Sequence, residues 1–197
     1  MQTTPPPSFY FGAMSPYSWL AAERIGRLLP EARWRGVLAG VIFAAHGRTS
    51  WGLTDQRAQG LAACEQRAGA YGLGPIHWPA AWPTSDLRVA RAIALAEQHG
   101  VMRAFSLGAM RMAFLEGADL EDLEVVLEAG RRVGIEPAEL QTALADPAVK
   151  LAVRETNDEA LAAGVFGVPT VVFGGELFWG DDRLDEAAAA YRATPRD

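Results

Sequence analysis

The sequence predicts an α/β protein whose sheet-forming segments lie near its two ends, with a long helical block between them. Three observations indicate this class. A short aromatic strand at 9–14 leads directly into a helix, and a second strand-like run follows at 33–43. Residues 84–163 read almost wholly as helix, and two short strands return within 168–180. The predicted order is therefore β-α-β, a helical block, and β-β-α.

The first half of this arrangement begins with the strand FYFGAM. Ser15 and Pro16 follow at once, and a serine N-cap with proline in the first turn is typical of a helix start. That helix runs to Pro30, and the segment RWRGVLAGVIF (33–43) then has the β-branched and aromatic residues of a second strand. A strand, helix and strand in succession favour a right-handed crossover.

Glycine and proline divide the rest of the chain. A helix from Asp55 leads to the proline-rich segment 72–83, and Asn157, within the last helix of the block, is expected on the helix surface. Breaks between the helices of the block are expected at Gly100, Gly117, Gly134 with Pro137, and Asp146 with Pro147. Gly174-Gly175 predicts a hairpin, which a final helix follows.

This order is that of the thioredoxin-like fold, with helices inserted between its β-α-β and β-β-α halves. We predict a thioredoxin-like domain formed by 8–83 and 164–197, and an inserted helical domain at 84–163. The proline-rich lead, 1–7, is expected to be disordered. A mixed α/β domain without a distinct insert would give a similar pattern.

Composition restricts the function. The chain has 197 residues, a net charge of -6 and no run of Lys or Arg, which disfavours nucleic-acid binding. No window approaches the roughly 18 apolar residues of a membrane helix, and MQTTPPPS has no signal-peptide character, so we expect a cytoplasmic protein without membrane association. Three histidines and one cysteine give no metal-ligand spacing, so no metal is expected. Cys64 is expected to be packed or half-exposed within its helix, and a free reactive thiol is the alternative.

The segment Ser15-Pro16-Tyr17-Ser18 occupies the place where thioredoxin-like proteins carry Cys-x-x-Cys, at the start of the first helix. A hydroxyl cannot cycle between thiol and disulfide, so this motif cannot perform disulfide exchange. The free amides of a helix start still favour an anion, and the Ser15 hydroxyl can donate a hydrogen bond to a thiolate that a ligand brings in. The alternative is that Ser15 only caps the helix.

Two segments, FYFGAMSPYSWLAAERI (9–25) and GVFGVPTVVFGGELFWGDDRLDEA (164–187), resemble the 2-hydroxychromene-2-carboxylate isomerases and kappa-class glutathione transferases of the DsbA-like thioredoxin superfamily. The resemblance implies a glutathione-dependent isomerase of aromatic catabolism. In the implied mechanism Ser15 stabilises the thiolate of glutathione or another low-molecular-weight thiol, which adds reversibly to an unsaturated aromatic-type substrate. The alternatives are a kappa-class-like glutathione transferase and a non-catalytic thioredoxin-like binding module.

The resemblance also implies where the thiol cofactor binds. Val168-Pro169 matches a cis-proline step, whose preceding backbone N–H and C=O pair with the peptide backbone of the thiol. Asp182 and Arg183 match a pair that holds the γ-glutamyl end of glutathione. The alternative for Asp182 and Arg183 is a solvated pair at a helix start, and Asp181 is a candidate N-cap.

On the substrate side, Tyr17, His46 and Trp51 are the candidates. His46 lies where the family commonly has Asn or Lys near the substrate, and a histidine there is able to act as an acid or base. A solvated loop histidine is the alternative. Tyr17 and Trp51 are candidates for the wall of an apolar pocket for a small-molecule substrate. A homodimer is a hypothesis that rests on the resemblance alone, because members of the family are often dimers.

Overall fold

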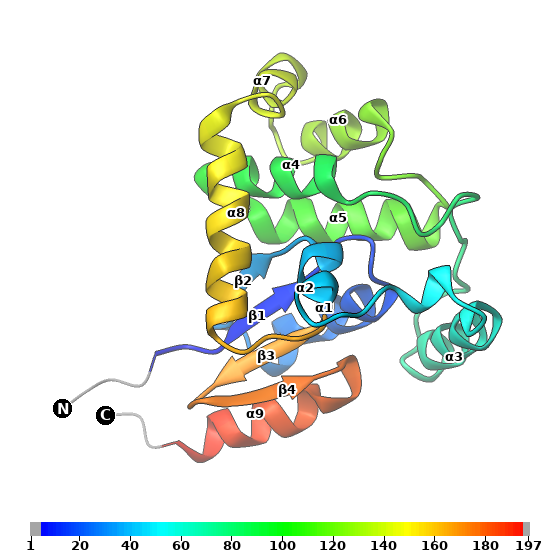
Figure 1. Ribbon diagram of the computed structural model, residues 1–197, viewed down its shortest axis with the longest axis vertical. Coiled ribbons are helices and arrows are strands. Elements are labelled where there is room, and N and C mark those ends of the chain that lie inside the picture. Colours follow the sequence, from blue (N-terminus) through cyan, green and yellow to red (C-terminus); the bar gives the residue numbers. More distant parts are fainter. Residues whose placement is uncertain (1–4, 195–197) are drawn as a thin grey trace.

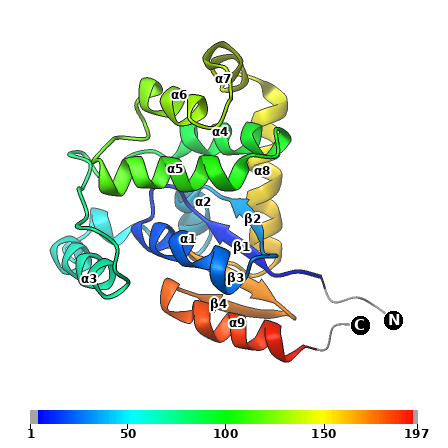
Figure 2. The same cartoon turned by 180° about the vertical axis from the view of Figure 1, so that it is seen from behind.

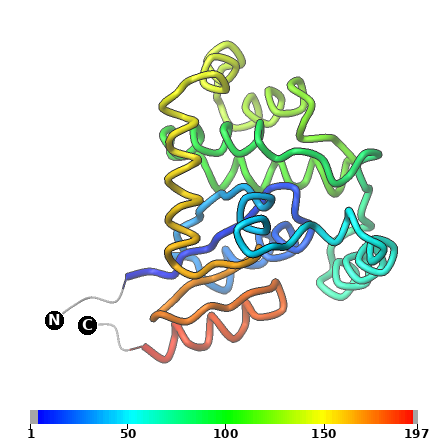
Figure 3. Tube along the Cα trace, viewed as in Figure 1, coloured from blue at the N-terminus to red at the C-terminus, as the bar shows by residue number. Residues whose placement is uncertain are grey.

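A computed structural model describes residues 5–194 of the chain. The strands of its sheet are β1 (Ser8–Phe11), β2 (Arg33–Gly36), β3 (Thr170–Phe173) and β4 (Glu176–Trp179), in the order β2-β1-β3-β4. β1 is parallel to β2, whereas β3 is antiparallel to both β1 and β4. The predicted α/β class and thioredoxin-like fold are confirmed, and strands from opposite ends of the chain lie side by side (Figure 3).

Side chains alternate between the two faces of β1, as its pleat requires. Phe9 and Phe11 enter a large core on one face, where they pack against Trp34. Tyr10 enters a smaller core on the other face, which contains Ile42 and Val168. Helices α1 (Pro16–Leu28) and α9 (Leu184–Ala193) contribute to the large core, α2 (Ala39–Ala45) contributes to the smaller one, and α8 (Pro147–Ala162) contributes to both.

The helical block follows α3 (Arg57–Ala70) and consists of α4 (Leu87–Gln98), α5 (Met102–Leu115), α6 (Leu123–Arg131), α7 (Pro137–Ala143) and α8. α4–α7 lie together beyond the β2 edge of the sheet (Figures 1 and 2). The predicted breaks at Gly100, Gly117 and Gly134 have φ of 72°, 71° and 82°, the left-handed conformation that ends helices. The large core is continuous from β1 into α4 and α5.

The predicted strand at 33–43 is wrong in its second half, because β2 is short and α2 follows it. Two polar side chains from the helical block hold the backbone at this point: Asn157 Oδ1 accepts from Leu38 N and Asp86 Oδ2 accepts from Ala39 N, each at 3.1 Å. Asn157 is therefore buried and not on the helix surface. Both partners are distant in sequence, so local patterning favoured a strand where tertiary contacts start a helix.

Of the predicted disordered lead, residues 1–4 lie outside the described residues. Pro7 is buried, and its carbonyl accepts a hydrogen bond of 2.8 Å from Arg33 N, so the fold already holds the chain there. Within residues 5–194, no helix is both long enough and apolar enough to span a bilayer.

Candidate active site

The turn between β1 and α1 is closed by its two serines. Ser15 has extended φ and ψ of -90° and 117° and caps α1, with its Oγ accepting from Ser18 N at 3.2 Å. Ser18 is buried, and its Oγ accepts from Gly12 N at 3.2 Å. Ser15 N in turn donates to Gly12 O at 3.0 Å. Ser15 therefore caps the helix as predicted, while no acceptor for its hydroxyl proton lies within the described part of the chain.

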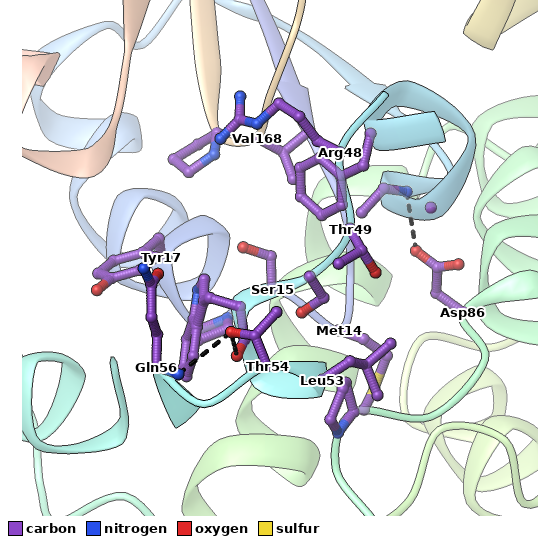
Figure 4. Close-up of a pocket in the computed structure, with 18 of the residues that line it drawn as sticks. Met14, Ser15, Tyr17, Arg48, Thr49, Leu53, Thr54, Gln56, Asp86 and Val168 are labelled. Carbon is purple, nitrogen blue, oxygen red and sulfur yellow. Dashed lines mark hydrogen bonds between the residues drawn. The ribbon is translucent and has the colours of Figure 1, made fainter. Parts of the chain in front are cut away.

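This turn borders a pocket of about 940 Å³, a size typical of small-molecule sites (Figure 4). Its wall is formed by the start of α1, the segment 39–56, one residue of α3, the end of the proline-rich segment with the residues that lead into α4, the loop before β3, and the end of β4 with the turn after it. Six of the predicted site residues line it together: Ser15, Tyr17, Trp51, Val168, Pro169 and Asp182. His46 and Arg183 do not line it.

The Val168-Pro169 peptide bond is cis, as the resemblance implied. Pro169 O accepts a hydrogen bond of 2.9 Å from Gly180 N. Neither the amide nor the carbonyl of Val168 takes part in a hydrogen bond among residues 5–194. Val168 thus offers a donor and an acceptor at the pocket wall to an extended ligand.

A buried ion pair supports the wall in front of α9. Asp181 is fully buried, and its carboxylate accepts hydrogen bonds from Tyr71 Oη at 2.9 Å and from Arg67 Nη1 at 2.5 Å. Arg67 Nη2 also lies 3.4 Å from Asp182 Oδ2. Burial raises the pKa of Asp181, although its bonds with Tyr71 and Arg67 act in the opposite direction. Asp181 is therefore a structural anchor and not a helix N-cap.

Arg183 is held outside the pocket. Its Nε donates to Glu186 Oε2 at 2.7 Å, and its guanidinium lies 5.3 Å from the centre of the Phe178 ring. Arg183 therefore lies at the helix start as the alternative expected, but its partner there is Glu186 and not Asp182. The guanidinium beside Asp182 belongs to Arg67 instead.

His46 is exposed at the end of α2 and turns away from the pocket. Its Nε2 lies 3.3 Å from Val165 O, and its ring packs beside Phe166. The physical reason is the helix found in place of the second half of the predicted strand, which changes the direction of every side chain from residue 39 onward.

Sequence reasoning missed Arg67, which α3 brings to the pocket only through tertiary packing. A signal was present: Arg67 and Tyr71 are four residues apart, a spacing that places both side chains on one helical face, and both contact Asp181. Arg48, from the loop after α2, also lines the pocket. Its Nη1 donates to Phe166 O at 3.2 Å, and no carboxylate among the described residues pairs with it.

The aromatic part of the wall is formed by rings that contact one another at an angle. The Trp51 ring lies 6.1 Å from the centre of Tyr17 and 4.9 Å from that of Trp82. Trp82 Nε1 donates to Met14 O at 2.9 Å, which fixes the orientation of its indole. These rings can pack against a flat apolar ligand.

Cys64, the chain's one cysteine, lies behind Tyr17 and is fully buried. Burial raises the pKa of its thiol to about 12, although a hydrogen bond with Tyr17 acts in the opposite direction. A thiol with this pKa stays protonated near neutral pH, so Cys64 is not a ready nucleophile. Among residues 5–194, no group of three or more His, Cys, Asp or Glu side chains is arranged to hold a metal ion.

Known proteins are similar to this chain along most of its length. The 2-hydroxychromene-2-carboxylate isomerase of Sphingobium xenophagum is 28% identical over 191 residues, covering 90% of this chain and 93% of that protein. Its namesake from Pseudomonas putida is 27% identical over 185 residues, covering 89% of each. A solved 2-hydroxychromene-2-carboxylate isomerase structure has a TM-score of 0.85 at 23% identity, covering 94% of both chains.

The resemblance predicted from the two sequence segments is therefore confirmed. The model of the DsbA-like thioredoxin domain matches residues 8–192, which is nearly the whole described chain. This chain belongs to the DsbA-like thioredoxin domain family.

Proposed function

We propose that this protein is a glutathione-dependent isomerase resembling 2-hydroxychromene-2-carboxylate isomerase. The observation that carries the proposal is the contrast between the positions of Ser15 and Cys64. A hydroxyl stands at the helix start in the pocket, while the one thiol of the chain is buried and protonated. A thiolate at this site therefore has to come from a bound cofactor, and a protein with one cysteine cannot form an internal disulfide.

The pocket supports binding of an extended thiol tripeptide. The Ser15 hydroxyl, whose proton has no acceptor in the described structure, is available to donate to the cofactor thiolate. The amide and carbonyl of Val168 are available to pair with the tripeptide backbone. At the other end, Asp182 is suited to an ammonium group and Arg67 to a carboxylate, as the γ-glutamyl end of glutathione requires.

In the proposed reaction the thiolate adds to a carbon–carbon double bond conjugated with a carbonyl group. The new C–S bond turns the double bond into a single bond, about which the substrate rotates. Elimination then re-forms the double bond and releases the thiolate, so no net oxidation or reduction occurs. Tyr17 and Trp51 supply an apolar wall for an aromatic-type substrate, and the unpaired Arg48 suits an acidic group on it.

Calorimetric titration with glutathione, followed by assays with a chromene-carboxylate and with a generic electrophile, tests the proposal. We expect glutathione to bind, the chromene-carboxylate to rearrange, and the glutathione concentration to stay unchanged. Consumption of glutathione would favour a kappa-class-like transferase, and absence of binding by any cellular thiol would favour a non-catalytic module. Ser15→Ala should lower turnover strongly, whereas Ser85→Ala, an exposed serine outside the pocket wall, should not.

A further inference from the structure

The carboxyl group of Asp86, at the start of α4, lies in the wall of the same pocket and has no role in the thiol binding proposed above. Asp86 Oδ2 accepts from Ala39 N at 3.1 Å, the hydrogen bond drawn beside the Asp86 label in Figure 4. No other side chain hydrogen-bonds to this carboxyl group, and no Arg, Lys or His pairs with it among residues 5–194. Asp86 is thus a pocket carboxyl without a counter-ion.

Asp86 and Ser15 are joined by a short chain of contacts across the start of α2. Asp86 holds Ala39 N, and Ala39 packs so closely on Gly12 that a Cβ added to Gly12 would lie 2.9 Å from Ala39 Cβ. Gly12 O accepts from Ser15 N at 3.0 Å. Ala39 and Gly40 themselves line the pocket, as do Ser15 and Asp86. A substrate beside the Ser15 hydroxyl therefore lies in the same cavity as the Asp86 carboxyl group.

No charged side chain in the surroundings of Asp86 stabilises the ionised form of its carboxyl group. α2, which packs against it, has the sequence AGVIFAA and carries no ionisable side chain. The charged groups of the pocket wall are Arg48, Asp55, Arg67, Asp181 and Asp182, and none of them shifts the pKa of Asp86.

On the elements around it, α4 carries Arg88 and Arg91, and α8 presents Asn157 to the same turn. Arg91 is directed to Leu144 O at 3.0 Å, and neither arginine shifts the pKa of Asp86. Burial raises that pKa from 3.8 to about 6, so the group can both release and recover a proton near neutral pH.

We propose that Asp86 is the proton-transfer residue of this pocket, an inference that rests on the proposed isomerase function. When the cofactor thiolate attacks the double bond, the C–S bond forms and the π electrons move to the conjugated carbonyl oxygen. The Asp86 carboxyl donates its proton to that oxygen and becomes a carboxylate. After rotation, the carboxylate takes the proton back, the double bond re-forms, and the C–S bond breaks with release of the thiolate.

The test is Asp86→Asn in the full chain, because asparagine keeps an acceptor for Ala39 N but cannot transfer a proton. We expect kcat of rearrangement to fall by about 10²-fold or more, with glutathione affinity and the pKa of the bound thiol unchanged. Wild-type activity should fall as pH rises through the pKa of Asp86, and the pH–rate profile of Asp86→Asn should lack this decrease. Asp158→Asn, an exposed aspartate on α8, should behave as wild type.

An Asp86→Asn enzyme with near wild-type kcat and the same decrease with rising pH would overturn the inference and leave the isomerase function standing. Failure of the unchanged protein to bind any thiol would instead overturn the proposed function and the inference with it. Far-ultraviolet circular dichroism of Asp86→Asn controls for folding. Carbon NMR of the Asp86 carboxyl gives an answer without turnover: we expect a midpoint near pH 6, and a carboxyl that titrates near its ordinary value would refute the role.

Discussion

Replacing Arg67 by methionine should destabilise the protein, because it removes the cation that compensates a buried carboxylate. The Asp181 side chain is 1% exposed and that of Arg67 35% exposed. Methionine retains much of the aliphatic length but not the charge, so Asp181 keeps only its bond with Tyr71. Removing one partner of a buried pair typically costs about 3–5 kcal/mol. Since water reaches part of the Arg67 side chain, we expect about 3 kcal/mol, at the lower end of that range.

Urea unfolding at neutral and at acidic pH checks this value. The loss of Arg67 raises the pKa of folded Asp181 further above its unfolded value, and a protonated Asp181 needs no cation. The loss of stability should therefore be largest at neutral pH and shrink as the pH falls through the folded pKa. Arg183→Met, at an exposed pair with Glu186, is the matched control and should leave the unfolding midpoint unchanged. A loss below about 1 kcal/mol, or one independent of pH, would show that Arg67 does not compensate a buried Asp181 carboxylate.

Three further substitutions or treatments test the packing and the titrating groups around the pocket. Gly12→Val should lower the melting temperature at a cost of about 1–3 kcal/mol, because its Cβ would meet Ala39, whereas Gly26→Ala, with open space around it, should not destabilise α1. Cys64 should resist alkylation in the native protein and react fully in urea, and rapid native labelling would contradict its burial. The folded pKa of Asp86 is raised, so its stabilising contribution is present below its ordinary value of 3.8 and is lost as pH rises through about 6. Asp86→Asn should thus raise stability by up to about 3 kcal/mol at mildly alkaline pH and by little at acidic pH, and an equal effect at both would be inconsistent with the shift.

Parts of the site could be predicted because their signals are local. Ser15 and Pro16 specify the helix start through the cap hydrogen bond and the fixed φ of proline. Gly174 and Gly175 specify the hairpin because both have positive φ, 59° and 83°, which other residues rarely adopt. Local chemistry of this kind needs no knowledge of the rest of the fold.

The rest depended on contacts between distant segments. α2 forms where Asp86 and Asn157 hold the backbone at residues 38 and 39, and these partners come from two helices far along the chain. The position of His46 could not be predicted because the sequence pattern favoured a strand where α2 forms. A helix and a strand direct their side chains differently. Arg67 reaches the pocket because α3 packs beside the turn that precedes α9, where it contacts Asp181 and Asp182. The spacing of charged residues in the sequence does not predict this contact.

The proposed role of the Ser15 hydroxyl is to stabilise the thiolate of a bound cofactor. Its most direct test is the ultraviolet absorbance of the glutathione thiolate in the complex, followed as a function of pH for the wild type and for Ser15→Ala. We predict a thiol pKa below that of free glutathione in the wild-type complex, and a clearly higher value with Ser15→Ala, because one hydrogen bond to the anion is lost. Equal thiol pKa values in the two complexes would contradict the role of Ser15.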